Sequence, residues 1–349
     1  MKLCWVIARR RAPQVRQPRA AAWLLAVACP LGPDVGTMNL LTPSQQLRAT
    51  SPSARIAASI GGISLGATSV AGGPVLQADE GLADFLVLDR ACDLEFVVAF
   101  GGPFDSAPGE LVFDSRGLWK LFRNAEGFCF RLTSDFIGAL PYKQAIVAPD
   151  FRSGRIEMSR EYFAPAQPLN PLEYPLDELL WIHRLSTGEG VEVHGCGVIA
   201  PDGRGLLLTG HSGAGKSTSS RLWSRRDGAR VLSDDRIILR REHGRIWMYG
   251  TPWHGDAGIA EADRSPLDGI FVLSHGEQNE IRPLSRTTAS AELFARSFVP
   301  HHSMDAIEFI LEFFSKVTAC VPCSEFSFVP DCSAVEALLS EDIGKIIAA

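Results

Sequence analysis

The sequence predicts a mixed α/β protein of the α+β kind, in which a strand, loop and helix unit follows a β-rich N-terminal region. An apolar run over 205–208 leads into a glycine-rich loop, and residues 219–223 can continue as a helix. Short segments that alternate between apolar and polar residues, broken by turns, fill residues 51–160. Residues 176–185 have the apolar spacing of a helix, with acids in the first turn where the helix dipole favours them.

Bulk composition narrows the class of protein. A chain of 349 residues suits one large or two ordinary domains, and the 46% of apolar residues can build a substantial core. The net charge of −6 argues against a general nucleic-acid partner, because neutralising phosphates needs a basic excess. No apolar run is long enough for a spanning helix, so we expect no membrane partner. Eight scattered cysteines fit a reduced, cytoplasmic location.

The chain divides into three predicted parts, 1–37, 38–170 and 171–349. Basic residues at 9–11 and an apolar stretch at 20–29 superficially resemble a secretory signal. The apolar stretch is short, and a second methionine, Met38, opens a more ordinary sequence. We therefore interpret residues 1–37 as a disordered leader or a misassigned start.

The two longer parts differ in pattern. We expect 38–170 to form an antiparallel β-rich region that carries no motif of its own. In 171–349, the helix at 176–185 is followed by a short strand at 190–195 and then by the glycine-rich unit. Residues 230–239 form a predicted strand interrupted by two acids. Nearer the C-terminus, one face of a predicted helix carries five apolar residues that we expect in the core: Ile307, Ile310, Leu311, Phe314 and Val317.

The glycine-rich loop has the sequence pattern of a phosphate-binding P-loop, or Walker A motif. Glycines let the backbone turn its N–H groups toward an anion, and the helix N-terminus adds partial positive charge. Lys216 can reach the outer phosphates, and the Ser217 hydroxyl is placed to ligate Mg²⁺. We therefore predict that the chain binds ATP with Mg²⁺. The predicted nucleotide-binding residues are Gly210, His211, Ser212, Gly213, Ala214, Gly215, Lys216, Ser217 and Thr218.

Three further residues predict phosphoryl transfer. Asp234 and Asp235 follow an apolar strand, and adjacent carboxylates on a strand point to opposite faces, so they can have different roles. One can hold Mg²⁺ while the other accepts a proton from a nucleophilic hydroxyl. Alternatively, Ser233–Arg236 is a solvated turn. His194 ends the strand before the P-loop unit, where a histidine can also be an ordinary core or turn residue.

In order and spacing these pieces resemble the catalytic domain of HPr kinase/phosphorylase and its relatives. The resemblance rests on 193–195 (Val-His-Gly), the loop at 210–217 and the pair 234–235. It implies the P-loop fold that HPr kinases share with phosphoenolpyruvate carboxykinases. It also implies a serine kinase in which His194 and Lys216 act at the phosphates, Ser217 binds Mg²⁺ and Asp235 is the base. Asp234 would support the metal or orient the base.

The chain departs from that family at two places. Thr218 stands where the family often has glutamate, and a later glutamate-containing segment has no obvious counterpart. Its place is taken by residues 249–258. Within them, 253–256 (Trp-His-Gly-Asp) either faces a site or forms a turn with a packed tryptophan. Arg236 can neutralise phosphoryl charge or pair with Asp234 at the surface, and the pairing is the expectation.

The function expected from these residues is transfer of the γ-phosphate of ATP to a serine of a small protein or peptide. The alternative is an ATP-binding or ATP-hydrolysing protein of the carboxykinase-like fold, acting on a small molecule or as a nucleotide sensor. A transporter-type ATPase would need a second signature downstream of the loop, and the sequence does not contain one. The oligomeric state stays open, although HPr kinases as a family form rings.

Overall fold

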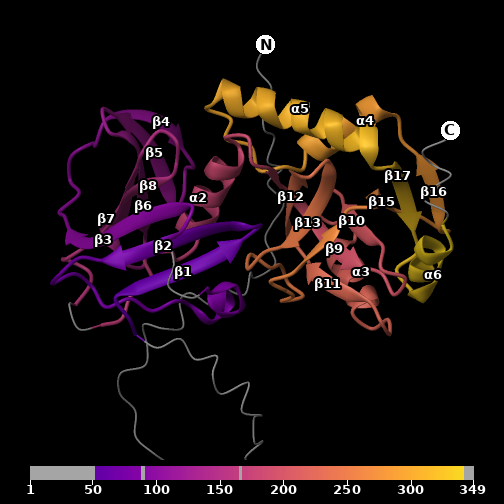
Figure 1. The fold of residues 1–349 in the computed structure, drawn as a ribbon, viewed down its shortest axis with the longest axis horizontal. Helices are drawn as coiled ribbons and strands as arrows, with labels where there is room; N and C mark the ends of the chain where they lie inside the picture. Colours follow the sequence, from indigo (N-terminus) through magenta and orange to yellow (C-terminus); the bar gives the residue numbers. More distant parts are fainter. Residues whose placement is uncertain (1–51, 88–90, 165–166, 342–349) are drawn as a thin grey trace, which may run out of the picture. The chain divides into compact units, whose positions relative to one another are not determined.

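The computed structural model describes residues 52–87, 91–164 and 167–341. The leader or misassigned start predicted at 1–37 lies outside these residues. The described residues all belong to one compact unit, in which their strands make one sheet of eight strands and another of nine (Figure 1). Mixed sheets with few helices are of the α+β kind that the sequence predicts.

The eight-stranded sheet occupies the β-rich region and has the order β1-β2-β3-β8-β7-β6-β5-β4. Its strands begin with a two-residue hairpin, because Gly61 and Gly62 have φ of 61° and 72°, which glycine adopts without strain. The strands are β1 (Arg55–Ile60), β2 (Ile63–Ser69), β3 (Leu94–Gly101), β4 (Glu110–Asp114), β5 (Trp119–Asn124), β6 (Gly127–Ser134), β7 (Gly138–Val147) and β8 (Ser153–Ser159).

The prediction of an antiparallel region is wrong for one strand. β3 pairs parallel with both β2 and β8, while the other pairs of this sheet are antiparallel. The link from Ser69 to Leu94 contains a 3₁₀ helix, η2 (Glu80–Phe85), and is long enough to carry the chain back across the sheet. A parallel pair needs such a crossover. The sequence did not reveal the parallel pairing of β3, because the alternation of apolar and polar residues is the same in parallel and antiparallel strands.

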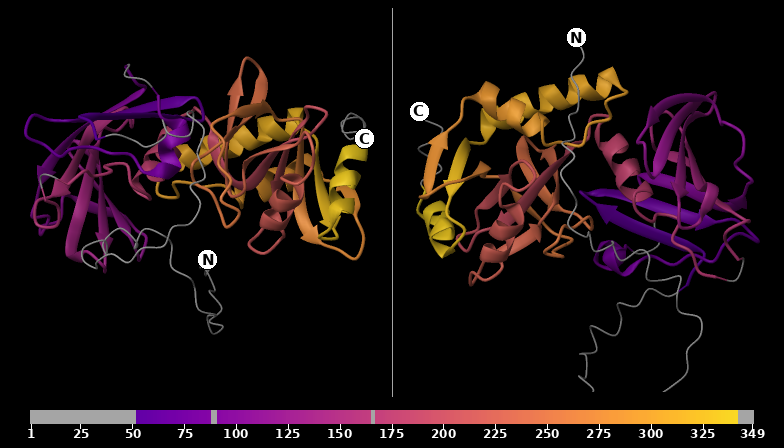
Figure 2. Two further views of the ribbon diagram at one scale, coloured as in Figure 1. Left: turned by 90° about the horizontal axis from the view of Figure 1, so that it is seen from below. Right: turned by 180° about the vertical axis from the view of Figure 1, so that it is seen from behind.

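Helix α2 (Leu176–Leu185) has the limits that the sequence predicts, and it packs into the core of the eight-stranded sheet. Its Trp181 is fully buried, and the indole Nε1 donates a hydrogen bond to the carbonyl of Ile60 at 2.9 Å. Figure 2 shows the helix against these strands. The boundary predicted at 170/171 stays a prediction, but α2, which lies after that boundary, belongs to this core.

The nine-stranded sheet has the order β14-β13-β12-β9-β10-β15-β17-β16, and β11 also pairs with β9. β10 and β15 are parallel, as are β15 and β17, whereas the remaining pairs are antiparallel. The strands are β9 (Val191–Ile199), β10 (Gly205–Thr209), β11 (Arg230–Ser233), β12 (Arg236–Glu242), β13 (Arg245–Gly250), β14 (Arg264–Pro266), β15 (Gly269–His275), β16 (Glu280–Pro283) and β17 (Cys323–Phe328).

Helices cover both faces of this sheet (Figure 1). α4 (Arg286–Phe294) and α5 (Met304–Cys320) pack on one face, where they contact Leu207. α3 (Lys216–Trp223) and α6 (Cys332–Ser340) pack on the other face with Leu206 and Leu208. β10 is therefore buried on both sides, which explains why its sequence is a continuous apolar run.

The predicted C-terminal helix is α5, and its buried stripe is narrower than expected. Ile310, Phe314 and Val317 are buried, but Leu311 is 48% exposed. Phe313, not Leu311, completes the stripe, since positions three and four apart share a face. Among the described residues, no helix is both long and apolar enough to cross a membrane.

Candidate functional site

The glycine-rich loop lies between β10 and α3, in the strand–loop–helix context that the sequence predicts. Gly213 and Gly215 have φ of 83° and 102°. A Cβ on Gly215 would lie 2.5 Å from the Cζ atom of Phe328, so both the backbone conformation and the space require glycine. No side chain caps α3, and its first turn holds no acid. The N-terminus of α3 can therefore receive an anion.

Lys216 is folded into the loop. Its Nζ donates hydrogen bonds to the carbonyl oxygens of Gly210 at 2.9 Å and His211 at 3.0 Å, and the residue is 6% exposed. Burial lowers the pKa of Lys216, while the charge of Asp235 opposes that shift. Ser217 and Thr218 are half-buried in the first turn of α3. The nucleotide roles assigned to 210–218 stay predictions.

The register of the sheet brings His194 and Asp235 to the base of this loop. Gly195 lies opposite Thr209, the last residue of β10, and His194 lies opposite Arg236 on the other side. The Gly195 N–H donates to the Asp235 carbonyl at 3.1 Å, and the Thr209 hydroxyl donates to the His194 carbonyl at 2.8 Å. Three segments that are distant in sequence therefore meet at neighbouring points of adjacent strands.

The side chains of His194 and Asp235 form a pair. His194 Nε2 is 2.8 Å from Asp235 Oδ1, and the side chains are 28% and 26% exposed. Burial alone would raise the pKa of Asp235. The hydrogen bond from His194 and the charges of Arg236, His194 and Lys216 outweigh burial and hold the pKa below its ordinary value. Asp235 is therefore held as a carboxylate.

Asp234 has different partners from Asp235. Its Oδ1 accepts the N–H of Gly255 at 2.9 Å, and its Oδ2 accepts the N–H of Ala257 at 2.8 Å. A longer hydrogen bond at 3.4 Å joins Oδ1 to the N–H of Ile259, and Asp234 is only 1% exposed. The carboxylate therefore anchors the 255–259 loop beside the site. The metal-binding role of Asp234 stays a prediction.

Arg236 does not pair with Asp234, which corrects the expectation from the sequence. Among the described residues its guanidinium pairs with Asp235, with Glu178 at 2.8 Å and with Glu192 at 3.6 Å. Asp234 is instead turned toward the 255–259 loop, whose N–H groups it accepts. Sequence reasoning missed Glu178 and Glu192, because their only signal is an acid in a helical first turn and an acid in an apolar strand.

The 253–256 segment combines the two expectations that the sequence left open. Trp253 is packed, since it is 8% exposed, donates from Nε1 to Asp177 Oδ2 at 2.8 Å and contacts Trp181 edge-on. Gly255 lies against the acids, because a Cβ there would be 3.0 Å from Asp234 Oδ2. The packed Trp253 thus holds the segment in place, and the lack of a side chain on Gly255 lets the segment lie close to the two acids.

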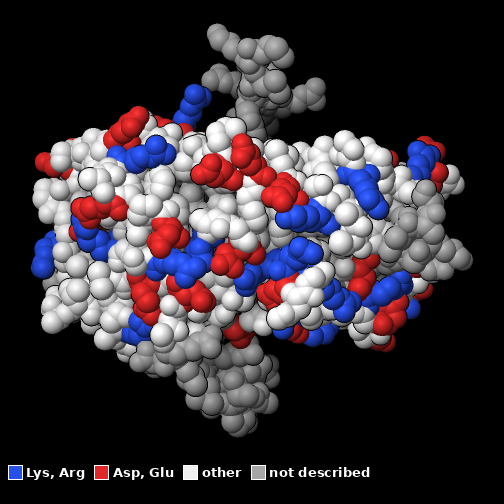
Figure 3. All heavy atoms as spheres, turned by 45° about the horizontal axis from the view of Figure 1, so that its top comes forward, with Lys and Arg blue, Asp and Glu red and all other residues white. Residues whose placement is uncertain are grey.

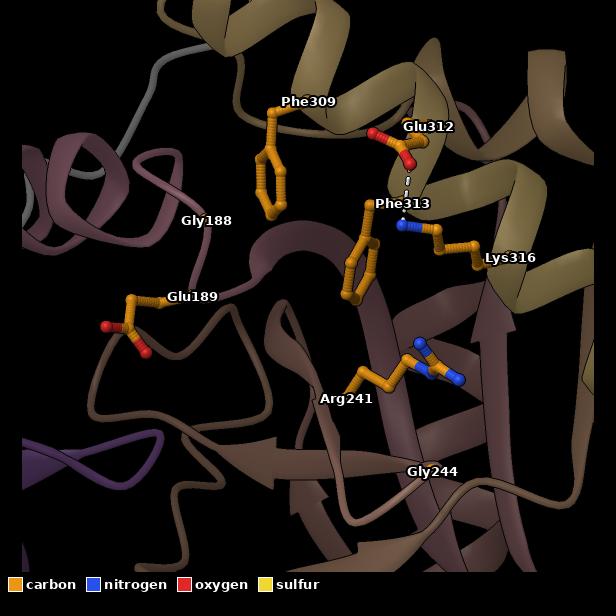
Figure 4. A pocket seen from close by; sticks show the side chains of 8 residues that line it. All are labelled: Gly188, Glu189, Arg241, Gly244, Phe309, Glu312, Phe313 and Lys316. Atoms are coloured by element: carbon orange, nitrogen blue, oxygen red, sulfur yellow. Dashed lines mark ion pairs between the residues drawn. The ribbon is translucent and has the colours of Figure 1, made fainter.

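A separate hollow of about 320 Å³ lies at the other end of β12 (Figure 4). Phe309, Phe313 and Lys316 of α5 face Arg241 across it, and Lys316 pairs with Glu312 at 2.7 Å. None of its lining residues belongs to the P-loop site. On the surface drawn in Figure 3, basic and acidic side chains are interspersed.

The residues at the loop fit a magnesium–nucleotide complex. Mg²⁺ prefers oxygen ligands and is usually held by one or two side chains together with substrate phosphates. The Ser217 hydroxyl in the first turn of α3 is an oxygen ligand of this type. Asp234, the other predicted metal residue, uses both carboxylate oxygens to accept loop N–H groups. In the described ranges there is no cluster of three or more His, Cys, Asp or Glu side chains that could hold a metal by themselves.

Comparison with known proteins gives a distant structural likeness. No protein-family model matches the chain, and no curated protein matches it. Among solved structures, it is similar to the HPr(Ser) kinase/phosphatase from Coxiella burnetii, with 18% identity over 42% of this chain and 93% of that chain. The TM-score is 0.26, so the relation is distant. Membership of the HPr kinase family stays a prediction.

Proposed function

We propose that the protein is an ATP- and Mg²⁺-dependent kinase that transfers the γ-phosphate to a serine hydroxyl of a small protein or peptide. The observation that supports this most strongly is the His194–Asp235 pair beside the P-loop. A protein that only binds a nucleotide has no need of a carboxylate oriented by an imidazole at that point. A phosphotransferase does, because the acceptor hydroxyl must lose a proton.

The loop and α3 bind the phosphates in this proposal. Backbone N–H groups of 213–216 and the α3 N-terminus face the phosphate oxygens. Lys216 exchanges its hydrogen bonds to two loop carbonyls for the outer phosphates, and Ser217 holds Mg²⁺. The metal, when bound, neutralises charge on the β- and γ-phosphates.

Asp235 acts on the acceptor. As the serine oxygen forms its bond to the γ-phosphorus, the bond from that phosphorus to the β–γ bridging oxygen breaks, and the electron pair leaves with ADP. The hydroxyl proton passes to Asp235, which His194 holds in place. The resulting carboxylic acid then releases the proton to water.

Replacement of the loop lysine tests the proposal. Lys216→Ala is expected to reduce transfer of ³²P from [γ-³²P]ATP to a degenerate serine-containing peptide pool by at least about 10²-fold, because a charge on the phosphates is lost. Lys316→Ala, on the exposed face of α5, is the matched control and should transfer at the wild-type rate. Equal transfer by Lys216→Ala and wild type would exclude this site as the phosphoryl-transfer centre.

The same experiment separates the alternatives. A small-molecule kinase would consume ATP only when that small molecule is added, and peptides would gain no label. A nucleotide sensor would bind ATP and label no acceptor. Labelled serine in the wild type, identified by mass spectrometry, supports the kinase proposal.

A further inference from the structure

Arg236 is held on three sides next to the proposed base. It opens β12, opposite His194, and its guanidinium donates hydrogen bonds to Asp235 Oδ2 and, at 2.8 Å, to Glu178 Oε1. The planar group also lies over the ring of Phe298, 4.3 Å from the centroid. The cation therefore has little freedom to turn away from Asp235.

The carboxylates behind Arg236 are buried. Glu178 is 5% exposed on α2, and the fully buried carboxylate of Glu192 lies 3.6 Å from Arg236 Nε. Burial and the charge of Glu178 raise the pKa of Glu192 well above its ordinary value. Glu178 and Asp235 are the two carboxyl groups that accept hydrogen bonds from Arg236.

A buried ion pair contributes little net stability, because desolvation offsets the attraction. The effect of this ion pair is to fix the orientation of the carboxylates. The rigid, planar fork of donors on a guanidinium fixes the directions of two carboxylates at once, whereas the rotatable ammonium group of a lysine does not. Since Oδ2 of Asp235 is held by Arg236, Oδ1 is turned toward His194.

We propose that Arg236 is a positioning residue that fixes Asp235 against His194, and that Glu178 holds Arg236 for this task. This inference rests on the proposed function, since it affects a rate only if Asp235 takes the proton. Glu178 belongs to α2, whose apolar side packs into the core of the eight-stranded sheet. The β-rich region thus acts on the reaction through α2, Glu178 and Arg236.

The kinetic test compares two arginines of one strand. Arg236→Gln should lower the rate of ³²P transfer at saturating MgATP by about 10²-fold, because a displaced base loses reactive geometry, while the dissociation constant for MgATP is unchanged. Arg240→Gln is the control. Arg240 is also ion-paired and similarly buried, 15% against 18% exposed, but binds Glu189 and the Gly61 carbonyl.

Two further variants separate positioning from a loss of folding. Arg236→Lys should recover only part of the rate, because a rotatable ammonium group does not fix the orientation of both carboxylates. Glu178→Gln keeps the shape of its side chain and should also slow transfer. The double variant Glu178→Gln/Arg236→Gln should be no slower than Arg236→Gln alone, as expected of residues that act as a unit.

A spectroscopic readout makes the test independent of phosphoryl transfer. In protein labelled with ¹⁵N-histidine, the His194 signals are identified by their loss in His194→Asn. The Nε2–H signal should have the shift of a carboxylate-bonded imidazole in wild type and in Arg240→Gln. It should move toward the value of a free imidazole in Arg236→Gln and Glu178→Gln.

The inference is overturned if Arg236→Gln leaves the His194 signal in place, or if it weakens MgATP binding in proportion to the lost rate. The second result would make Arg236 a phosphate ligand. If the wild type labels no acceptor, the proposed function fails, and the His194 signals alone decide whether Arg236 positions Asp235.

Discussion

The side chains at the site form pairs between residues that are distant in the sequence. His194 meets Asp235 at 2.8 Å, and Lys216 is buried in the loop beside them. The sequence singled out all three, since each stands in a recognisable pattern. It misjudged Arg236, because a partner across the fold leaves no trace in the local order of residues. The sequence predicted a surface ion pair with Asp234, whereas in the structure Arg236 pairs with Asp235 and Glu178.

At this scale, Asp235→Asn tests the proposed base. The amide keeps the shape of the carboxylate but cannot take a proton, so transfer to the peptide pool should fall by about 10²- to 10⁴-fold. MgATP binding, measured by calorimetry, should persist, because the phosphates contact the loop and Lys216. Parallel loss of binding and transfer would show that Asp235 serves the nucleotide and not the acceptor.

Elements of the second sheet were largely predictable. α2 has the predicted limits, and β10 extends the predicted strand by one residue, to Thr209. α3 begins at Lys216, three residues before the predicted start, and His194 lies within β9, not at the end of the shorter strand predicted at 190–195. The parallel pairing of β3 was not predictable, because a strand pattern does not record strand direction. The exposure of Leu311 was not predictable either. Helical spacing shows which side of a helix is apolar, but it does not decide which residues at the edge of that side are buried.

The loop as an element depends on Gly215. Gly215→Ala places a methyl group in an unfavourable left-handed conformation and against Phe328, so we expect MgATP affinity to fall. Gly203→Ala is the control, since Gly203 has a φ of 88° but no atom within 4 Å of the added Cβ. That variant should cost about 1–3 kcal/mol of unfolding free energy and leave affinity unchanged. Similar affinities for both variants would contradict the role of Gly215.

Over the whole molecule, contacts with α2 join the two sheets. Ile238 and Tyr249 of the nine-stranded sheet and Trp253 of the following loop belong to the same buried cluster as Trp181. Asp177 of α2 accepts the Trp253 hydrogen bond at 2.8 Å. The sequence patterns of 38–170 and 171–349 did not predict this shared core, because contacts between distant segments arise only from tertiary packing.

The buried Asp177 carboxyl that accepts the Trp253 hydrogen bond predicts that the stability of the fold depends on pH. Burial raises the pKa of Asp177 to about 7, although hydrogen bonds from Trp253 and the Glu178 N–H oppose it. In the unfolded chain the pKa is about 3.9. The folded state therefore prefers the protonated form, and this contribution is present below about pH 4 and lost as the pH rises through about 7.

Urea unfolding across that range measures the effect. The unfolding free energy of wild type should fall relative to that of Asp177→Asn as the pH is raised. Asp135→Asn, at an exposed turn, should follow the wild type. A constant difference between wild type and Asp177→Asn from about pH 4 to about pH 7 would contradict the burial argument.

The central claim is that the loop after β10 and the first turn of α3 bind the phosphates of a nucleoside triphosphate. Titration calorimetry of the wild type with ATP, ADP, AMP and adenosine, each with Mg²⁺, tests it most directly. If the loop holds the β- and γ-phosphates, affinity should drop steeply between ADP and AMP, and Lys216→Ala should remove most of the preference for ATP. Equal affinity for ATP, AMP and adenosine would contradict the account.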